Sequence, residues 1–227
     1  MPNAPREAPW VIPLALAPLL LQSLVDGLYK APLHRWSASA FWLVDAAKFV
    51  LLPAVVLWCL ARFAGVRPRD YGLRWPRTPE ERNALLGAAL FACFVLVPLY
   101  FAAQELAWRA GRFTAPDFGY ETALPAARFL RWLAIGYFAL TAGIVEEIVF
   151  RGLPWTWAAR FGDTRTTRWT WVAMTSVLFG LVHWENGLPE VLTTGVFGVG
   201  AALLYLKLRN LWPLVLAHVV ADVVAFA

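Results

Sequence analysis

Long apolar runs, separated by short polar and arginine-rich links, set the pattern of this chain. An apolar run of about 20 residues is long enough for a helix to cross a bilayer. Seven helices are expected over such runs: Trp10–Leu28, Ala40–Ala64, Ala84–Trp108, Phe129–Phe150, Thr170–His183, Leu188–Leu206 and Leu211–Phe226. A short, tryptophan-rich helix over Leu153–Phe161, lying in the membrane interface, is expected as an eighth. The pattern predicts an all-α, polytopic transmembrane bundle of about seven to eight helices.

Two finer expectations come from the same runs. Asp45 and Lys48 lie three positions apart in the second run, so we expect them to pair on one helix face. In the sixth run, Gly195, Gly198 and Gly200 are expected to let a neighbouring helix approach closely.

Composition agrees with a membrane protein. The 227 residues are 60% hydrophobic and 15% charged, with 13 Trp and a mean hydropathy of +0.57. Soluble domains average about 25% charged residues. The two cysteines, Cys59 and Cys93, lie in apolar runs and form no CxxC pattern, which excludes a thiolate metal site.

The net charge of +5 is a topology signal and does not indicate nucleic-acid binding. Thirteen Lys and Arg residues fall in links on one side of the predicted bundle and six on the other. The positive-inside rule then places the N-terminus in the cytoplasm and the C-terminus outside. If the helix at 153–161 crossed the membrane, the orientation of all later helices would be reversed. We expect a multi-pass protein of the inner (plasma) membrane, with a polar, exposed linker over 109–125.

Two adjacent glutamates lie near the end of the fourth run, within GIVEEIVFRG (143–152). A charge at mid-membrane depth costs roughly 2.5–3.5 kcal/mol on insertion scales. Glu147 precedes Arg151 by four positions, the favourable order for a helical ion pair. Adjacent helix residues differ by about 100°, so Glu146 faces another way, without a basic partner nearby in the sequence. Glu146 is therefore a candidate general base; the alternative is that both glutamates cap a helix end at the membrane surface.

Two further segments carry imidazoles. His183 lies four residues after Phe179, and Asp222 lies four after His218, so each pair shares one helix face. Taken singly, a histidine at a helix end is more often structural. Two polar groups four positions apart in a membrane helix usually face a site or a partner helix; the alternative is an internal pair in which Asp222 only holds the imidazole. Glu, two His and Asp converging in a bundle would form either an N/O metal site, such as a zinc site, or a metal-free site that activates water. HExxH is absent.

These three segments, in this order, resemble the motif set of the CPBP (CAAX-protease and bacteriocin-processing, or Abi) membrane protease family, which includes the type II CAAX prenyl endopeptidases. EExxxR reads Glu146-Glu147-xxx-Arg151, FxxxH reads Phe179-xxx-His183, and HxxxN/D reads His218-xxx-Asp222. The resemblance covers 126–227. Residues 1–125 match only in hydrophobicity and are expected to hold the N-terminal transmembrane helices and a basic cytosolic loop.

The resemblance implies an intramembrane glutamic endopeptidase. In this scheme Glu146 activates water, His183 holds the same water, and His218 and residue 222 stabilise the oxyanion, while Glu147, Arg151 and Phe179 are supporting residues. No cofactor is expected. Well-understood members carry Asn at the last motif position, however, and an ionised Asp222 cannot donate a hydrogen bond. Either Asp222 is protonated, or it orients His218, or the site binds zinc through Glu146, His183, His218 and Asp222.

The expected function is therefore hydrolysis of a peptide bond in a hydrophobic, membrane-embedded or lipid-anchored protein, within the lipid bilayer. We do not carry over a prenylated substrate, and we expect no nucleic-acid partner. Two alternatives are a non-catalytic immunity or scaffold protein with the same fold and, less favoured, a proton-coupled carrier. Glu185 and Asn186 are left out of the predicted site because polar loop residues are usually just solvated.

Overall fold

Helices account for the secondary structure of the chain. The computed structural model describes residues 9–111 and 120–227, and these residues form no strand. The helices of the first half are α1 (Val11–Leu24), α2 (Asp26–Trp36), α3 (Ala38–Ala46), α4 (Leu52–Phe63) and α5 (Pro79–Ala110). Those of the second half are α6 (Arg128–Glu147), α7 (Leu153–Ala158), α8 (Arg165–Leu181), α9 (Leu188–Leu208) and α10 (Trp212–Phe226).

Two of the junctions between helices are continuous. Wide turns of π-helical geometry, η1 (Ala47–Leu51) and η4 (Ile148–Gly152), join α3 to α4 and α6 to α7. Counted with these turns, the described residues form eight continuous helices. The all-α bundle of seven to eight helices is thus confirmed, and the short helix near 153–161 is a continuation of α6.

Four helices are long and apolar enough to cross a membrane: Ala38–Phe63, Pro79–Ala110, Arg128–Phe161 and Leu188–Leu208. The bent pair α1–α2 makes a fifth if it is one span, and α10 is a shorter apolar helix. Large apolar side chains such as Phe94 (80% exposed) cover the outside of these helices, as expected for a surface facing lipid. The chain is a membrane protein. The predicted fifth span, Thr170–His183, corresponds to α8, which is not among the helices that meet this test.

The first span differs from the single helix expected over Trp10–Leu28. Helix α1 ends at Leu24, and the chain bends by 54° and continues as α2. At the bend, the Leu24 carbonyl oxygen accepts a hydrogen bond from the Trp184 indole Nε1 at 2.7 Å. Because α2 stays within the bundle, Lys30, which the sequence pattern placed in a link, is buried.

The ion pair expected between Asp45 and Lys48 is wrong. Lys48 pairs with Asp26 of α2, and Asp45 accepts a hydrogen bond from the Tyr137 hydroxyl of α6 at 3.0 Å. The spacing of charged residues within one helix does not reveal that a residue of a neighbouring helix is a better ion-pair partner. Arg151 likewise lies just beyond the predicted fourth span, which ends at Phe150, but it is buried in η4.

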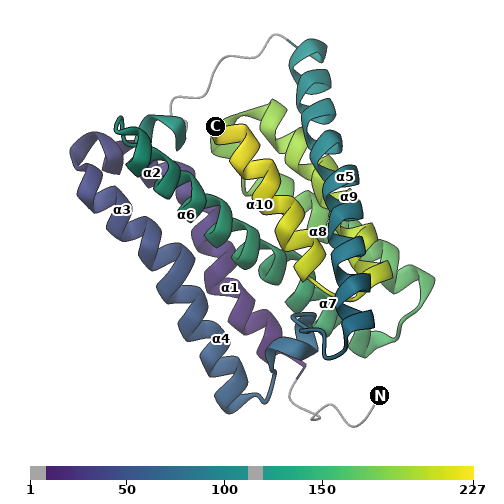
Figure 1. Cartoon of the computed structure of the whole chain (residues 1–227). Coiled ribbons are helices and arrows are strands. Elements are labelled where there is room, and N and C mark those ends of the chain that lie inside the picture. The colour runs from purple at the N-terminus through teal and green to yellow at the C-terminus, as the bar shows by residue number, and fades with distance from the viewer. Residues whose placement is uncertain (1–8, 112–119) are drawn as a thin grey trace.

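Figure 1 shows α6 running between a layer formed by α1–α4 and a layer that contains α5, α8, α9 and α10. α1 begins at one end of the bundle and α10 ends at the opposite end. That arrangement agrees with termini on opposite sides of the membrane, while the side that faces the cytoplasm stays a prediction. Residues 112–119 of the predicted linker at 109–125 lie outside the described residues.

Glycines bring α8 close to α9, and α9 close to α5. A Cβ on Gly198 would lie 3.1 Å from the Cα of Ser176, and one on Gly200 would lie 2.8 Å from a methyl of Leu99. The tightest position on α8 is Gly180, where a Cβ would lie 2.6 Å from the Val191 carbonyl oxygen. Gly195 of α9 faces this position: a Cβ on Gly180 would lie 3.4 Å from the Gly195 Cα, so a side chain on Gly195 would add to the crowding. The predicted close approach thus involves glycines of both helices.

We expect Gly180→Ala to destabilise the protein by about 1–3 kcal/mol, because the added methyl overlaps the backbone of α9. The matched control is Gly136→Ala in α6, where a Cβ meets nothing within 4 Å. That change should leave stability unaltered or raise it by up to about 1 kcal/mol, since alanine favours helix. Thermal unfolding in detergent micelles measures both. Equal stability of Gly180→Ala and wild type would contradict this packing.

Candidate active site

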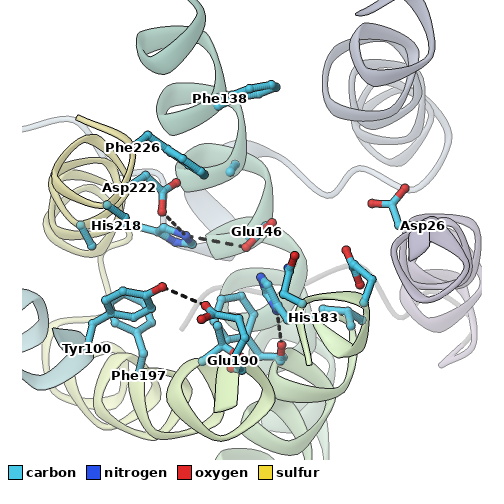
Figure 2. A pocket seen from close by; sticks show the side chains of 18 of the residues that line it. Asp26, Tyr100, Phe138, Glu146, His183, Glu190, Phe197, His218, Asp222 and Phe226 are labelled. Carbon is cyan, nitrogen blue, oxygen red and sulfur yellow. Dashed lines mark hydrogen bonds and ion pairs between the residues drawn. The ribbon is translucent and has the colours of Figure 1, made fainter. Parts of the chain in front are cut away.

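A cavity of about 550 Å³ is lined by residues of both layers of the bundle and of α6. All four residues predicted as catalytic, Glu146, His183, His218 and Asp222, line it. They come from α6, the turn after α8, and α10. Figure 2 shows His218 and Asp222 on one side of the cavity and Glu146 and His183 nearer its centre. Positions up to 76 residues apart in the sequence are thus brought to one polar interior.

The buried carboxylate of Glu147 joins two of the motifs. Its Oε1 accepts a bond from Arg151 Nη1 at 3.2 Å and one from His218 Nδ1 at 2.9 Å. Both Glu147 and Arg151 are fully enclosed, at 0% and 1% exposure. The predicted Glu147–Arg151 pair is confirmed. The bond to His218 is an addition, because its two residues are 71 positions apart and no local spacing indicates it.

Phe179 packs against the charged groups of the other two motifs. The Arg151 guanidinium lies 4.2 Å from the centre of its ring, and the His183 and His218 rings lie at 5.0 and 6.0 Å. A guanidinium over an aromatic face is a favourable contact that is strengthened by burial. Phe179 therefore fixes the spacing between Arg151 and the two imidazoles.

Glu146 points away from the Glu147–Arg151 pair and into the cavity, as the helix geometry predicted. Its Oε2 lies 3.7 Å from His218 Nε2, which is too long for a hydrogen bond. Among the described residues, this oxygen has no hydrogen-bond partner. Glu146 is thus a carboxylate with free acceptor capacity in a cavity, which is what a general base for water requires.

The two imidazoles are held by different partners. His183 Nδ1 lies 2.7 Å from the Phe179 carbonyl oxygen. A carbonyl only accepts, so Nδ1 carries the hydrogen, and Nε2 of the neutral ring is left as an acceptor. His218 uses Nδ1 to donate to Glu147, and its Nε2 faces Glu146 and Asp222.

Asp222 makes only a loose contact with the imidazole. Its Oδ1 is 3.8 Å from His218 Nε2, whereas Glu147 bonds the opposite nitrogen at 2.9 Å. The orientation of the His218 ring therefore depends on Glu147, and Asp222 is available to the cavity.

The described acidic and imidazole side chains of the cavity are not grouped as metal ligands are. Within residues 9–111 and 120–227, no group of three or more His, Cys, Asp or Glu side chains is arranged to hold a metal. The zinc alternative, through Glu146, His183, His218 and Asp222, thus has no preformed ligand set there. The expectation that no cofactor is needed stays a prediction.

The sequence analysis missed the polar residues of the other parts of the cavity. Asp26, Lys30 and Lys48 form the wall across from His218, together with Glu185, which had been set aside as a loop residue. Asn186, set aside for the same reason, also lines the cavity, and the Tyr100 hydroxyl donates to Glu190 at 2.8 Å beside it. A signal was present for Asp26 and Lys30, which are four apart and form an ion pair of 2.7 Å. The bend at Leu24 concealed this pair. In a straight first span over Trp10–Leu28, Asp26 lies near the end of the helix and Lys30 lies beyond it.

We expect Arg151→Met to destabilise the protein by roughly 3–5 kcal/mol, because it leaves the buried Glu147 carboxylate without its cationic partner. Adding Glu147→Gln to Arg151→Met should recover part of that loss by removing the unpaired charge. Unfolding in detergent micelles measures both variants. Arg165→Met, on the exposed first turn of α8, is the control and should change little. Similar losses for Arg151→Met and Arg165→Met would contradict a structural role for the pair.

Residues 128–224 match the family model described as Rce1-like, type II CAAX prenyl endopeptidase Rce1-like. The matched segment runs from the start of α6 into α10, contains all three motifs and lies within the predicted 126–227 core. No curated protein and no solved structure matches the chain significantly. The three motifs and the matched model agree, and residues 128–224 are similar to the Rce1-like type II CAAX prenyl endopeptidases, a family of peptidases.

Proposed function

We propose that the chain is an intramembrane endopeptidase of the glutamic type, in which Glu146 activates water for attack on a peptide bond. The observation that carries the proposal is the shared cavity. Glu146, His183, His218 and Asp222 line it together, and among the described residues one carboxylate oxygen of Glu146 has no hydrogen-bond partner.

In the proposed reaction, Glu146 accepts a proton from a water molecule while His183 Nε2 accepts a hydrogen bond from the second proton of that water. The resulting hydroxide adds to the carbonyl carbon of the scissile bond, and the carbonyl oxygen becomes an oxyanion. His218, protonated on Nε2, and residue 222 face the position where this charge develops. Glu146 then gives its proton to the leaving nitrogen, the C–N bond breaks, and the base is regenerated as a carboxylate.

The substrate we propose is a hydrophobic or lipid-anchored protein segment near its membrane junction. The cavity lies within a bundle whose outer surface is apolar, so a segment reaching it comes from lipid or from the membrane boundary. The polar lining would supply water to a peptide bond that lipid otherwise keeps dry. We place the protein in the inner (plasma) membrane as a multi-pass chain, in accordance with the distribution of its basic links.

We expect Glu146→Gln to lower kcat for peptide cleavage by at least about a hundredfold, because the amide cannot accept the proton from water. The assay is cleavage of a quenched fluorescent, membrane-anchored peptide library by the purified protein in detergent micelles. Glu105→Gln, an exposed glutamate of α5 paired with Arg109, is the matched control and should retain full activity. The unfolding temperature of Glu146→Gln should equal that of the wild type.

Other outcomes of this assay would support the alternatives. Loss of wild-type activity with a strong chelator would indicate a metal enzyme. Proton-dependent uptake of a solute without cleavage would favour a carrier. Absence of cleavage by a well-folded wild type, together with an unchanged cellular phenotype for Glu146→Gln, would favour an immunity or scaffold protein.

Residue 222 gives a second prediction. An aspartate donates to an oxyanion only while protonated, whereas asparagine donates at every pH. We therefore expect the kcat/KM of the wild type to fall as pH rises through deprotonation of Asp222, and Asp222→Asn to lack that fall. Asp222→Ala should lose about 10²–10³-fold in kcat at its best pH. An Asp222→Asn variant that is folded but inactive at every pH would mean that the carboxylate itself is required.

A further inference from the structure

We propose that Lys48 and Glu185, on the wall of the cavity across from His218 and Asp222, bind a backbone peptide group of the substrate. The inference rests on the proposed endopeptidase function. It assigns a substrate-binding role to side chains that the three motifs do not contain.

Four charged side chains form this wall, which we call the charged wall: Asp26 and Lys30 of α2, Lys48 of η1, and Glu185 of the turn after His183. Lys30 Nζ lies 2.7 Å from Asp26 and 3.4 Å from Glu185, and Lys48 forms an ion pair with Asp26. None of the four side chains is more than 9% exposed. The charges are thus held away from bulk water at the edge of a cavity.

Hydrogen-bonding capacity is left over at two places on the charged wall. Glu185 Oε2 is buried and has no hydrogen-bond partner among the described residues. Lys48 has three donors, and in the described structure its ammonium group pairs with the Asp26 carboxylate and lies over the face of the Phe49 ring. One spare acceptor and at least one spare donor therefore belong to residues that line the cavity.

A buried polar atom without a partner costs about 1–3 kcal/mol, and the Glu147–Arg151 pair also leaves Glu147 Oε2 and Arg151 Nη2 without one among the described residues, so the unpartnered Glu185 oxygen gains its meaning from where it lies. Replacing a buried ion-pair network by apolar side chains is often neutral or stabilising. Ionisable groups kept inside a membrane bundle therefore call for a ligand or a reaction. The position of this network on the cavity, rather than between packed helices, favours a ligand.

The chemistry of the wall selects a peptide over an ion. Two ammonium groups and two carboxylates give a formal charge of zero, so neither an anion nor a cation gains from a net opposite charge. A peptide chain presents one N–H donor and one C=O acceptor for each residue. In a bilayer these groups have no water to bond, so a substrate drawn out of helical form needs partners inside the protein. Glu185 can accept the N–H, and Lys48 can donate to the C=O.

The charged wall is also correctly placed relative to the proposed base. Lys48 and Lys30 are both near enough to Glu146 for their charges to interact. Figure 2 shows Asp26 across the cavity from His218 and Asp222, with Glu146 and His183 between them. A peptide bound to the charged wall would pass beside Glu146, with its scissile carbonyl facing His218.

The test is a backbone-ester scan of a bound peptide. The probe is the tightest-binding member of an N-palmitoylated peptide library, measured by fluorescence anisotropy on full-length Glu146→Gln protein in lipid nanodiscs, where no turnover intervenes. Replacing one peptide bond by an ester removes a single N–H donor. We expect one ester position to weaken binding by about tenfold, as for a hydrogen bond to a charged acceptor. In Glu146→Gln/Glu185→Leu, the same ester should have no further effect.

Protein variants provide the second arm. Lys48→Met in the Glu146→Gln background should weaken binding of the all-amide peptide by about tenfold. Lys207→Met, at the exposed end of α9, should not change it. Glu185→Gln keeps an acceptor oxygen and should retain the sensitivity to the ester. If Lys48→Met does not fold, the ester scan still decides, because its key change is in the peptide.

Failure of this inference is distinct from failure of the proposed hydrolysis. A uniform scan, or an ester penalty that persists in the Glu185→Leu background, overturns the backbone-binding role even if the wild type cleaves peptide. An ester penalty that depends on Glu185 supports it even if the wild type cleaves nothing, in which case only the hydrolysis fails. If no library peptide binds the Glu146→Gln protein, the inference is also overturned.

Discussion

The buried charge of Glu147 constrains the whole motif-bearing half of the molecule. Taking a carboxylate out of water is affordable only where a cation and hydrogen bonds replace the solvent, and here Arg151 and His218 do so on a single oxygen. Arg151 in turn lies over Phe179. One charge thus determines the relative placement of α6, α8 and α10. The neighbouring Glu146, turned by one helix step, lacks such bonds. Of the two adjacent glutamates, Glu147 therefore stabilises the fold, and Glu146 is available for the proposed reaction.

The cavity depends on both halves of the chain, although the family match covers only the second. Residues 128–224 supply the motif side, while Asp26, Lys30 and Lys48 on the opposite side come from α2 and η1. The N-terminal helices are therefore more than a membrane anchor for the matched segment. A polar cavity in lipid needs a second wall that excludes hydrocarbon, and these helices supply one aspartate and two lysines, whose charges are balanced only together with Glu185 of the second half.

The parts of this arrangement that follow from local spacing could be predicted. The Glu147–Arg151 pair and the divergence of Glu146 come from the helical repeat, and the apolar runs indicated most of the spans. Contacts between distant segments could not, because spacing within one helix says nothing of its neighbours. The bond from His218 to Glu147 and the pairing of Lys48 with Asp26 are of this kind. The bend after Leu24 had a similar effect, since the glycine nearest to it, Gly27, lies within the first turn of α2 and not at the break itself.

The hydrogen bond from the Trp184 indole to the Leu24 carbonyl has a consequence for biogenesis. Its partners are 160 residues apart, and the carbonyl is one that the break between α1 and α2 frees from the helix. In hydrocarbon an unbonded carbonyl is costly. During synthesis from the N-terminus, the bent pair α1–α2 therefore enters the membrane before its hydrogen-bond partner exists. The Leu24 carbonyl is bonded only after the turn that carries Trp184 has been made.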